Sequence, residues 1–105
     1  MNKTRGLIMN KLLAVALLFC ATATYAAPDM TKYNQSCAVC HASGAANAPK
    51  TGDVSAWEPR LAKGIDVLLQ SVNNGLNAMP PKGMCFDCSD EDYKALIDFM
   101  ATAAE

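Results

Sequence analysis

The sequence of 105 residues lacks a long hydrophobic run, an internal repeat and any extended stretch in which apolar and polar residues alternate. Its main apolar run, residues 12–21, has ten residues, whereas a helix that spans a bilayer needs about 20. Without a period-two pattern, a β-sheet is not expected. The chain also has a single histidine, His41, so no imidazole is left as a general base if that side chain is used elsewhere. These absences argue against a spanning helix, a sheet and a histidine-dependent enzyme.

The first 26 residues have the pattern of a cleaved secretory signal. Three basic residues precede or border the apolar run, and Thr24-Tyr25-Ala26 before Ala27 has the composition of a cleavage region. We therefore expect residues 1–26 to be removed and residues 27–105 to form one exported, periplasmic domain.

The most specific motif is Cys37-Ala38-Val39-Cys40-His41, the attachment signature of a c-type haem. On a helical turn, both thiols can face one edge of the macrocycle and form thioether bonds with its two vinyl groups. The imidazole of the next residue can then reach the iron. The motif predicts one covalently bound haem c, attached at Cys37 and Cys40, with His41 as an iron ligand.

Size and charge agree with an exported haem protein. The segment 27–105 has 79 residues, so a hydrophobic core made of side chains alone would stabilise it only marginally. A buried haem would enlarge that core. They contain six basic and ten acidic residues, and 6 − 10 gives a net charge of −4. This charge argues against nucleic acid as a partner and would suit docking to a positively charged redox protein.

The pattern of residues predicts an all-α domain of about three to five short helices wrapped around the haem. Asp29 can cap a helix that runs from Met30 into the haem motif. Residues 42–53, which are rich in Gly, Ala, Asn and Pro, predict a loop. A short helical turn is expected at residues 55–61, with Pro59 limiting its length.

The second half of the chain predicts two further helices. Residues from 65 onward have an amphipathic helical spacing that stops at Gly75. Residues 76–88 are expected to be irregular because Pro80 and Pro81 interrupt a helix. Ser89 begins a sequence that resembles a capping box. The apolar residues on these two helices are Ile65, Leu68, Leu69 and Val72, then Tyr93, Leu96, Ile97 and Met100.

The second axial ligand of the iron determines the function, and methionine is the ligand typical of an electron carrier. A thioether favours Fe(II) and raises the reduction potential. Met30 and Met100 fit helical positions. Pro80 directly after Met79 favours an extended, rigid backbone, whereas Gly83 beside Met84 allows mobility. We predict Met79 as the sixth ligand, with Met84 as the alternative.

Cys85 and Cys88 form a second Cys-x-x-Cys pair. In an exported protein the preferred interpretation is a structural disulfide. A zinc site would need four ligands, and the haem motif already uses the other candidates. A thioredoxin-like redox pair would need a βαβ context, which the sequence does not predict.

Three further residues are candidate haem contacts. The indole N–H of Trp57 and the guanidinium of Arg60 could donate to a haem propionate, or Trp57 could be a core residue and Arg60 a solvated one. The carbonyl of Pro49 could accept from the second ring nitrogen of His41 and so fix its tautomer.

With these residues, the chain resembles the class I cytochromes c, specifically the small bacterial cytochrome c5 group. The shared elements are Cys37-Ala38-Val39-Cys40-His41, Ala48-Pro49-Lys50, Gly52-Asp53, Trp57, Gly75-Leu76-Asn77-Ala78-Met79-Pro80-Pro81-Lys82-Gly83, and Cys85 and Cys88 before Ser89-Asp90. The resemblance implies terminal helices that cross at one haem edge, His41 and Met79 as axial ligands, and a Cys85–Cys88 disulfide. It also implies a soluble or loosely membrane-associated periplasmic electron carrier.

We therefore predict single-electron transfer between respiratory redox partners and not catalysis, since two axial ligands would keep substrates from the iron. Two alternatives stay open: a gas-binding or peroxidase-like haem protein with a labile sixth ligand, and the haem subunit of a larger oxidoreductase. The expected partners are electron donors and acceptors, such as membrane respiratory complexes or terminal oxidases and reductases, with peripheral membrane association. The expected state is a monomer.

Overall fold

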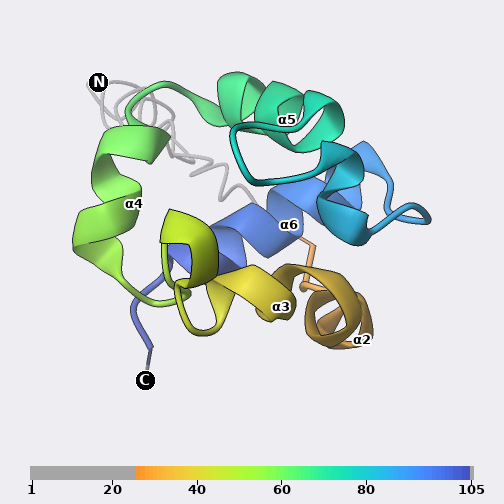
Figure 1. The fold of residues 1–105 in the computed structure, drawn as a ribbon, viewed down its shortest axis with the longest axis horizontal. Helices are drawn as coiled ribbons and strands as arrows, with labels where there is room; N and C mark the ends of the chain where they lie inside the picture. The colour runs from red at the N-terminus through yellow and green to blue at the C-terminus, as the bar shows by residue number, and fades with distance from the viewer. Residues whose placement is uncertain (1–25, 105) are drawn as a thin grey trace, which may run out of the picture.

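The computed structural model describes residues 26–104, which contain helices and no β-strand (Figure 1). The prediction of an all-α fold is confirmed. The predicted signal segment falls, but for its last residue, outside the described part of the chain. Within residues 26–104, no helix has the length and apolar character required to cross a bilayer. The helices are α2 (Met30–Lys32), α3 (Ala38–His41), α4 (Val54–Leu61), α5 (Ile65–Asn74) and α6 (Asp90–Ala101), with a π-helical turn at Tyr33–Cys37 and 3-10 turns at Ala45–Asn47 and Pro81–Met84.

Helix α2, the π turn and α3 follow one another without a break and form a single N-terminal helix. As predicted, the Asp29 carboxylate caps its start, accepting hydrogen bonds from the backbone N–H groups of Thr31 (3.0 Å) and Lys32 (3.2 Å). In the π turn, the buried Ser36 hydroxyl donates to the Lys32 carbonyl at 2.6 Å. A π turn inserts an extra residue into the helix, so the residues before and after it point in different directions.

The π turn separates the packing face of the N-terminal helix from its haem-motif face. Before Cys37, the buried Tyr33 ring meets Phe99 of α6 edge to face, with ring centroids 5.0 Å apart. Its hydroxyl lies 2.8 Å from the hydroxyl of Thr51. Cys37, the last residue of the turn, lines a cleft together with Cys40 and His41.

Helix α4 contains Pro59, which does not end it. The Asp53 carboxylate caps the helix, accepting from Ala56 N (3.2 Å) and from the Ser55 hydroxyl (2.8 Å). The Ser55 bond, followed by the Ala56 bond, lowers the pKa of this carboxyl below its ordinary value. Because proline lacks an N–H group, Pro59 cannot donate to the Ser55 carbonyl, yet the helix continues two residues further, to Leu61.

Helix α5 has the predicted amphipathic character and boundaries. It begins after Gly64 and ends before Gly75, with Val72 buried and Leu68 and Leu69 packed against the core. The prediction of this helix is confirmed.

The loop after α5 is tight and holds the backbone of Met79. Leu76 N donates to Met79 O (3.0 Å) and Met79 N donates to Leu76 O (2.9 Å). Gly75 has φ +83° and ψ 159°, and a Cβ there would lie 2.9 Å from Met79 O. The loop therefore requires glycine at this position.

Helix α6 supplies most of the core. The predicted capping box is present: Asp92 N donates to Ser89 Oγ (3.1 Å), and Ser89 N donates to the Asp92 carboxylate (2.9 Å). Lys32 Nζ lies 2.7 Å from the same carboxylate and joins α2 to α6. That bond is the main cause that lowers the pKa of Asp92 and raises the pKa of Lys32. The predicted core face of α6 is buried: Tyr93, Leu96, Ile97 and Met100.

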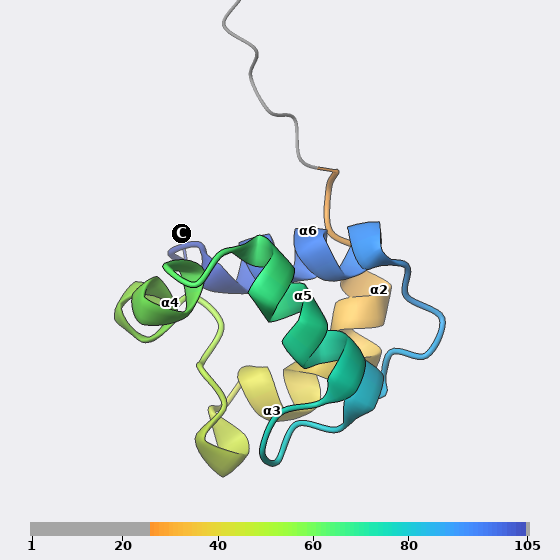
Figure 2. The same cartoon turned by 90° about the horizontal axis from the view of Figure 1, so that it is seen from above.

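Helix α6 lies against the other helices (Figures 1 and 2). In Figure 1, α6 crosses at the back, with α5 above it, α4 at the left and α2 and α3 below. Figure 2, turned by 90°, shows α3 and the loop after α5 on the side opposite α6. The haem motif and the Met79 loop therefore lie on the same side of the α6 core.

Candidate haem site

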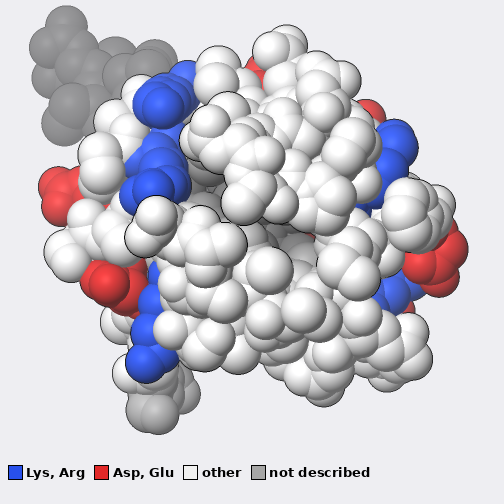
Figure 3. Space-filling model, viewed as in Figure 1, with Lys and Arg blue, Asp and Glu red and all other residues white. Residues whose placement is uncertain are grey.

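The helices enclose a cleft of about 880 Å³, visible as the hollow near the centre of Figure 3. This volume is within the range of cofactor and ligand pockets, about 300–1,000 Å³. The lining is mainly apolar and includes residues from the N-terminal helix, α4, α5, residues 76–84 and α6. A large apolar group such as a haem fits this lining.

The two cysteines of the haem motif line the cleft as free thiols. Cys37 and Cys40 are each half-buried and lie one helical turn apart. Burial raises the pKa of the Cys37 thiol, while the Ser36 hydroxyl, 3.7 Å from the sulfur, acts in the opposite direction. Both sulfurs are thus available on the surface that would contact the edge of a haem.

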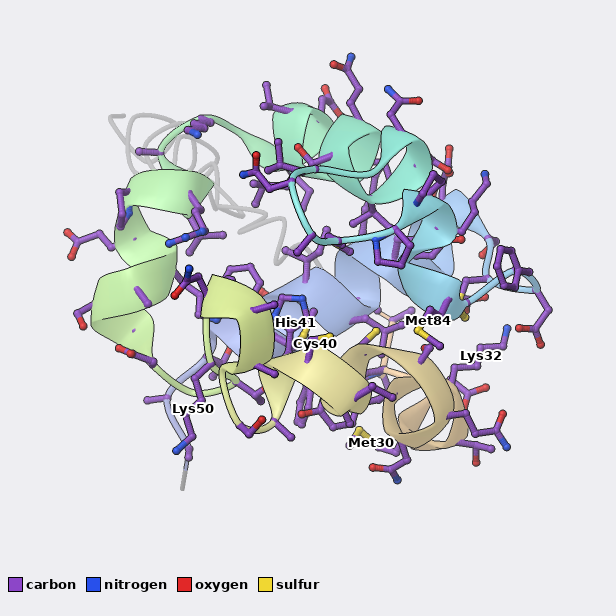
Figure 4. All side chains as sticks on the ribbon, in the orientation of Figure 1. Met30, Lys32, Cys40, His41, Lys50 and Met84 are labelled. Atoms are coloured by element: carbon purple, nitrogen blue, oxygen red, sulfur yellow. A yellow bond between two sulfur atoms is a disulfide. The ribbon has the colours of Figure 1, made fainter. Side chains whose placement is uncertain are left out.

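His41 is buried and is held at its ring and at its backbone. The ring Nδ1 lies 2.8 Å from the carbonyl oxygen of Pro49, the partner expected from the sequence. A carbonyl can only accept, so Nδ1 carries the proton and donates, which leaves the lone pair of Nε2 free for a metal. The ring stacks on Trp57, with centroids 5.7 Å apart and an interplanar angle of 28°. Figure 4 shows His41 near the centre of the molecule, above α3.

The segment of residues 49–52 connects the His41 side of the cleft to helices α4 and α6. Its successive groups form four hydrogen bonds with three residues: Pro49 O with His41 Nδ1 (2.8 Å), Lys50 O with Trp57 Nε1 (3.0 Å), Thr51 N with His41 O (2.8 Å), and Gly52 N with Met100 O (2.8 Å). This segment fixes the position of the imidazole relative to α4 and α6.

Trp57 and Arg60, the two predicted propionate contacts, both line the cleft, and each donates to a backbone carbonyl of the chain. The buried Trp57 indole donates to Lys50 O. The half-buried Arg60 guanidinium donates to Ala56 O. A bond from the Trp57 N–H to a propionate would compete with the Lys50 carbonyl. Arg60 has further N–H groups to offer, so the propionate contacts stay predictions.

Met79 and Met84 both line the cleft, but their environments differ. Met79 is half-buried, packs against the core, and has its backbone in the Leu76 bridge. Its terminal Cε would lie 2.9 Å from a Cβ at Gly83, so that glycine makes room for the Met79 side chain. Met84, the last residue of the 3-10 turn Pro81–Met84, is 49% exposed and has φ +65°; Figure 4 shows it to the right of His41.

Cys85 and Cys88 are joined as a disulfide, with Cα atoms 5.5 Å apart. The residue after Cys88 is Ser89, whereas the haem signature needs the histidine that follows Cys40. The prediction of haem attachment therefore stays with Cys37 and Cys40, which are followed by His41. The disulfide loop is anchored by the buried Tyr93 hydroxyl, which donates to Cys85 O at 2.6 Å.

Comparison with known proteins decides the family. Residues 28–100 match a family model described as cytochrome c oxidase, cbb3-type, subunit III. The chain is 55% identical over 67 residues to cytochrome c5 of Azotobacter vinelandii, an alignment that covers 62% of this chain and 81% of the relative. It is 45% identical to cytochrome c5 of Ectopseudomonas mendocina, covering 62% and 77%. The chain belongs to the cytochrome c5 family of class I cytochromes c.

Solved structures agree with this assignment. A mono-haem ferrocytochrome c from Shewanella putrefaciens superposes with a TM-score of 0.65 and 56% identity, covering 77% of this chain and all of that one. A chain in a crystal structure of an electron transfer complex of nitrite reductase with cytochrome c superposes with a TM-score of 0.63 and 46% identity, covering 69% and 88%. The predicted resemblance to the cytochrome c5 group is thus confirmed. This protein is a mono-haem c-type cytochrome that binds one haem c covalently, and it is an electron carrier and not an enzyme.

Three contributors to the cytochrome site were not identified from the sequence. They are the Lys50 carbonyl that holds Trp57, the Ser36 hydroxyl in the π turn, and Gly83, which the sequence suggests only as a source of mobility for Met84. The pairing of Lys50 with Trp57 depends on how the 42–53 loop folds back, and no local signal encodes it. The glycine in Met-Pro-Pro-Lys-Gly was the one available clue to the close contact with Met79.

Proposed function

We propose that this cytochrome carries single electrons between redox proteins in the periplasm through an iron ligated by His41 and Met79. The proposal depends on one observation: two candidate iron ligands line the same cleft, and hydrogen bonds fix the position of each. The buried His41 imidazole is bonded through Nδ1 to Pro49 O, and the half-buried Met79 thioether lies in the loop that the Leu76–Met79 backbone bonds close. When bound, the haem supplies the Fe(II)/Fe(III) couple. The remaining roles belong to the chain.

On the His41 side, the chain sets the basicity and direction of the ligand. The bond from Nδ1–H to Pro49 O increases the electron density of the imidazole. Stacking on Trp57 and the bond between Thr51 N and His41 O limit rotation of the residue. Cys37 and Cys40 attach the group covalently on the same helical turn.

On the other side, the loop geometry supports Met79 over Met84. The Leu76 bridge fixes the Met79 backbone and Gly83 leaves space for its methyl group, whereas Met84 is largely solvent-exposed. A thioether ligand stabilises Fe(II) and suits a carrier. Ligation by two side chains would leave no open iron position, so this arrangement also supports a carrier over a gas-binding protein.

The signal-like pattern of residues 1–26 supports export to the periplasm. The match to a cytochrome crystallised with nitrite reductase supports a redox protein as partner. We propose that the cytochrome acts as a separate monomeric carrier between such proteins.

The ligand assignment is tested by the weak red absorption band that Met–Fe(III) ligation produces. Met79→Ala and Met84→Ala are compared as purified oxidised holoproteins. We expect Met79→Ala to lose the band, to bind carbon monoxide when reduced and to show a lower reduction potential, and Met84→Ala to retain the wild-type spectrum. Loss of the band in Met84→Ala alone would reassign the ligand. A wild-type protein that lacks the band and binds carbon monoxide rapidly would refute the closed carrier site.

A further inference from the structure

The chain just after Met79 has an unusual backbone. Three consecutive residues of the 3-10 turn, Lys82, Gly83 and Met84, have φ angles of +67°, +55° and +65°. This region suits glycine and is costly for residues that carry a Cβ, so Lys82 and Met84 need contacts that hold them in it. We call residues 82–84 the left-handed turn. It contains Gly83, the residue that leaves space for the methyl group of Met79.

The backbone hydrogen bonds of the left-handed turn close it only upon its own loop. Gly83 N donates to Pro80 O (2.9 Å), and Cys85 N donates to Lys82 O (2.9 Å). Neither bond fixes the turn relative to a helix. In Figures 1 and 2 the turn lies beside the C-terminal end of α5, so a side chain of that helix is placed to hold it.

Asn73, in the last turn of α5, connects the left-handed turn to two helices. Its Nδ2 donates to the Leu69 carbonyl of α5 (3.2 Å) and to the Asp90 carboxylate of α6 (3.2 Å). These two bonds orient the half-buried amide so that its Oδ1 accepts from Lys82 Nζ at 2.7 Å. A hydrogen bond from an ammonium group is shorter and stronger than one between neutral groups. Asn73 thus fixes the turn against α5 and the start of α6.

We propose that Asn73 is a positioning residue for the sixth iron ligand: it holds the left-handed turn through Lys82, and the turn holds the Met79 thioether through Gly83. This inference rests on the proposed function, since it takes Met79 as the ligand. When the bond between Asn73 and Lys82 is lost, Lys82 can leave its costly φ region, Gly83 moves with it, and Met79 leaves the iron more often. Neither Asn73 nor Lys82 lines the cleft, so their effect on the iron passes through the turn.

Asn73→Ala and Asn74→Ala form a matched pair on the same helix. Asn74 is exposed, and within residues 26–104 its side chain forms no hydrogen bond. The measurement is the rate at which the reduced holoprotein binds carbon monoxide, which requires the sixth ligand to leave. We expect Asn73→Ala to bind about fivefold faster, the factor that corresponds to a hydrogen bond of about 1 kcal/mol, and to have a lower reduction potential. Asn74→Ala should match the wild type. Alanine favours a helix more than asparagine, so unfolding of α5 would not explain the difference, and equal rates in all three proteins would overturn the proposal.

A second substitution tests whether the effect passes through Lys82. Lys82→Leu removes the ammonium group and should accelerate carbon monoxide binding by a similar factor. Adding Asn73→Ala to this variant should change the rate little further. If Asn73→Ala accelerates binding equally in both backgrounds, Asn73 does not act through Lys82 and the proposal is wrong.

Amide hydrogen exchange at Gly83 separates this inference from the proposed function. The Gly83 N–H is bonded to Pro80 O, so its exchange reports opening of the turn itself. We expect faster exchange in Asn73→Ala and wild-type exchange in Asn74→Ala. Faster exchange with an unchanged carbon monoxide rate would mean that the turn does not control Met79, and would overturn this inference alone. A wild-type protein without the red band would overturn the proposed ligation, and this inference with it.

Discussion

Substituting Gly75 by alanine should displace the proposed iron ligand Met79. Gly75 has φ +83° and ψ 159°, a region nearly restricted to glycine, where another residue costs about 1–3 kcal/mol. The new Cβ would also lie 2.9 Å from Met79 O, 3.0 Å from Pro81 N and 3.1 Å from Pro81 Cδ. These are mostly backbone atoms, so the whole loop must move, at a further cost of about 1–3 kcal/mol. We expect a weakened or lost red band, a lower reduction potential and reduced stability in urea unfolding.

Gly64 provides the matched control for this substitution. It has φ 95° and ψ 150°, in the same region as Gly75, but a Cβ there meets no atom within 4 Å. Gly64→Ala should therefore show the backbone cost alone, with an unchanged absorption spectrum. Equal losses of stability in the two variants, with the red band retained in both, would refute the claim that the Gly75 contact holds Met79.

Three other predictions concern the support of the core. Asp92→Asn should destabilise the protein near neutral pH: Lys32 lowers the Asp92 pKa in the folded state, so the stabilisation is full above the ordinary value of 3.8 and is lost as the pH falls below it. The difference from wild type in urea unfolding should shrink at about pH 3, and a constant difference would contradict this origin. Replacing Cys85 and Cys88 by serine should cost about 2 kcal/mol, and in the wild-type holoprotein mass spectrometry should find two alkylated thiols only after reduction. Tyr93→Phe should cost about 1 kcal/mol, because the Cys85 carbonyl loses a buried hydrogen bond, without altering the red band.

The helices that the sequence predicted well are those whose signals are local. The amphipathic spacing of residues 65–74 and the Ser89 capping box depend on neighbours within one or two turns, and the structure has both. The haem motif is likewise a contiguous pattern. Features that depend on tertiary contacts were not predicted. The π turn coincides with the packing of Tyr33 on Phe99 and Thr51, residues distant in the sequence.

The environment of Trp57 shows where local reasoning ends. The helix that contains it was predicted at residues 55–61, and α4 does end at Leu61, two residues after Pro59. The partner of the Trp57 N–H could not be predicted because Lys50 reaches it only through the folded 42–53 loop.

The four-residue segment 49–52 has a consequence for the speed of electron transfer. It bonds the His41 ring and backbone, the Trp57 indole and the Met100 carbonyl, so the carbonyl that holds the imidazole belongs to a segment that is itself fixed to α4 and α6. A ligand held in this way keeps nearly the same position when the iron gains or loses an electron. We therefore expect a small inner-sphere reorganisation energy, so that the nuclear rearrangement accompanying each turnover adds little to the barrier of electron exchange.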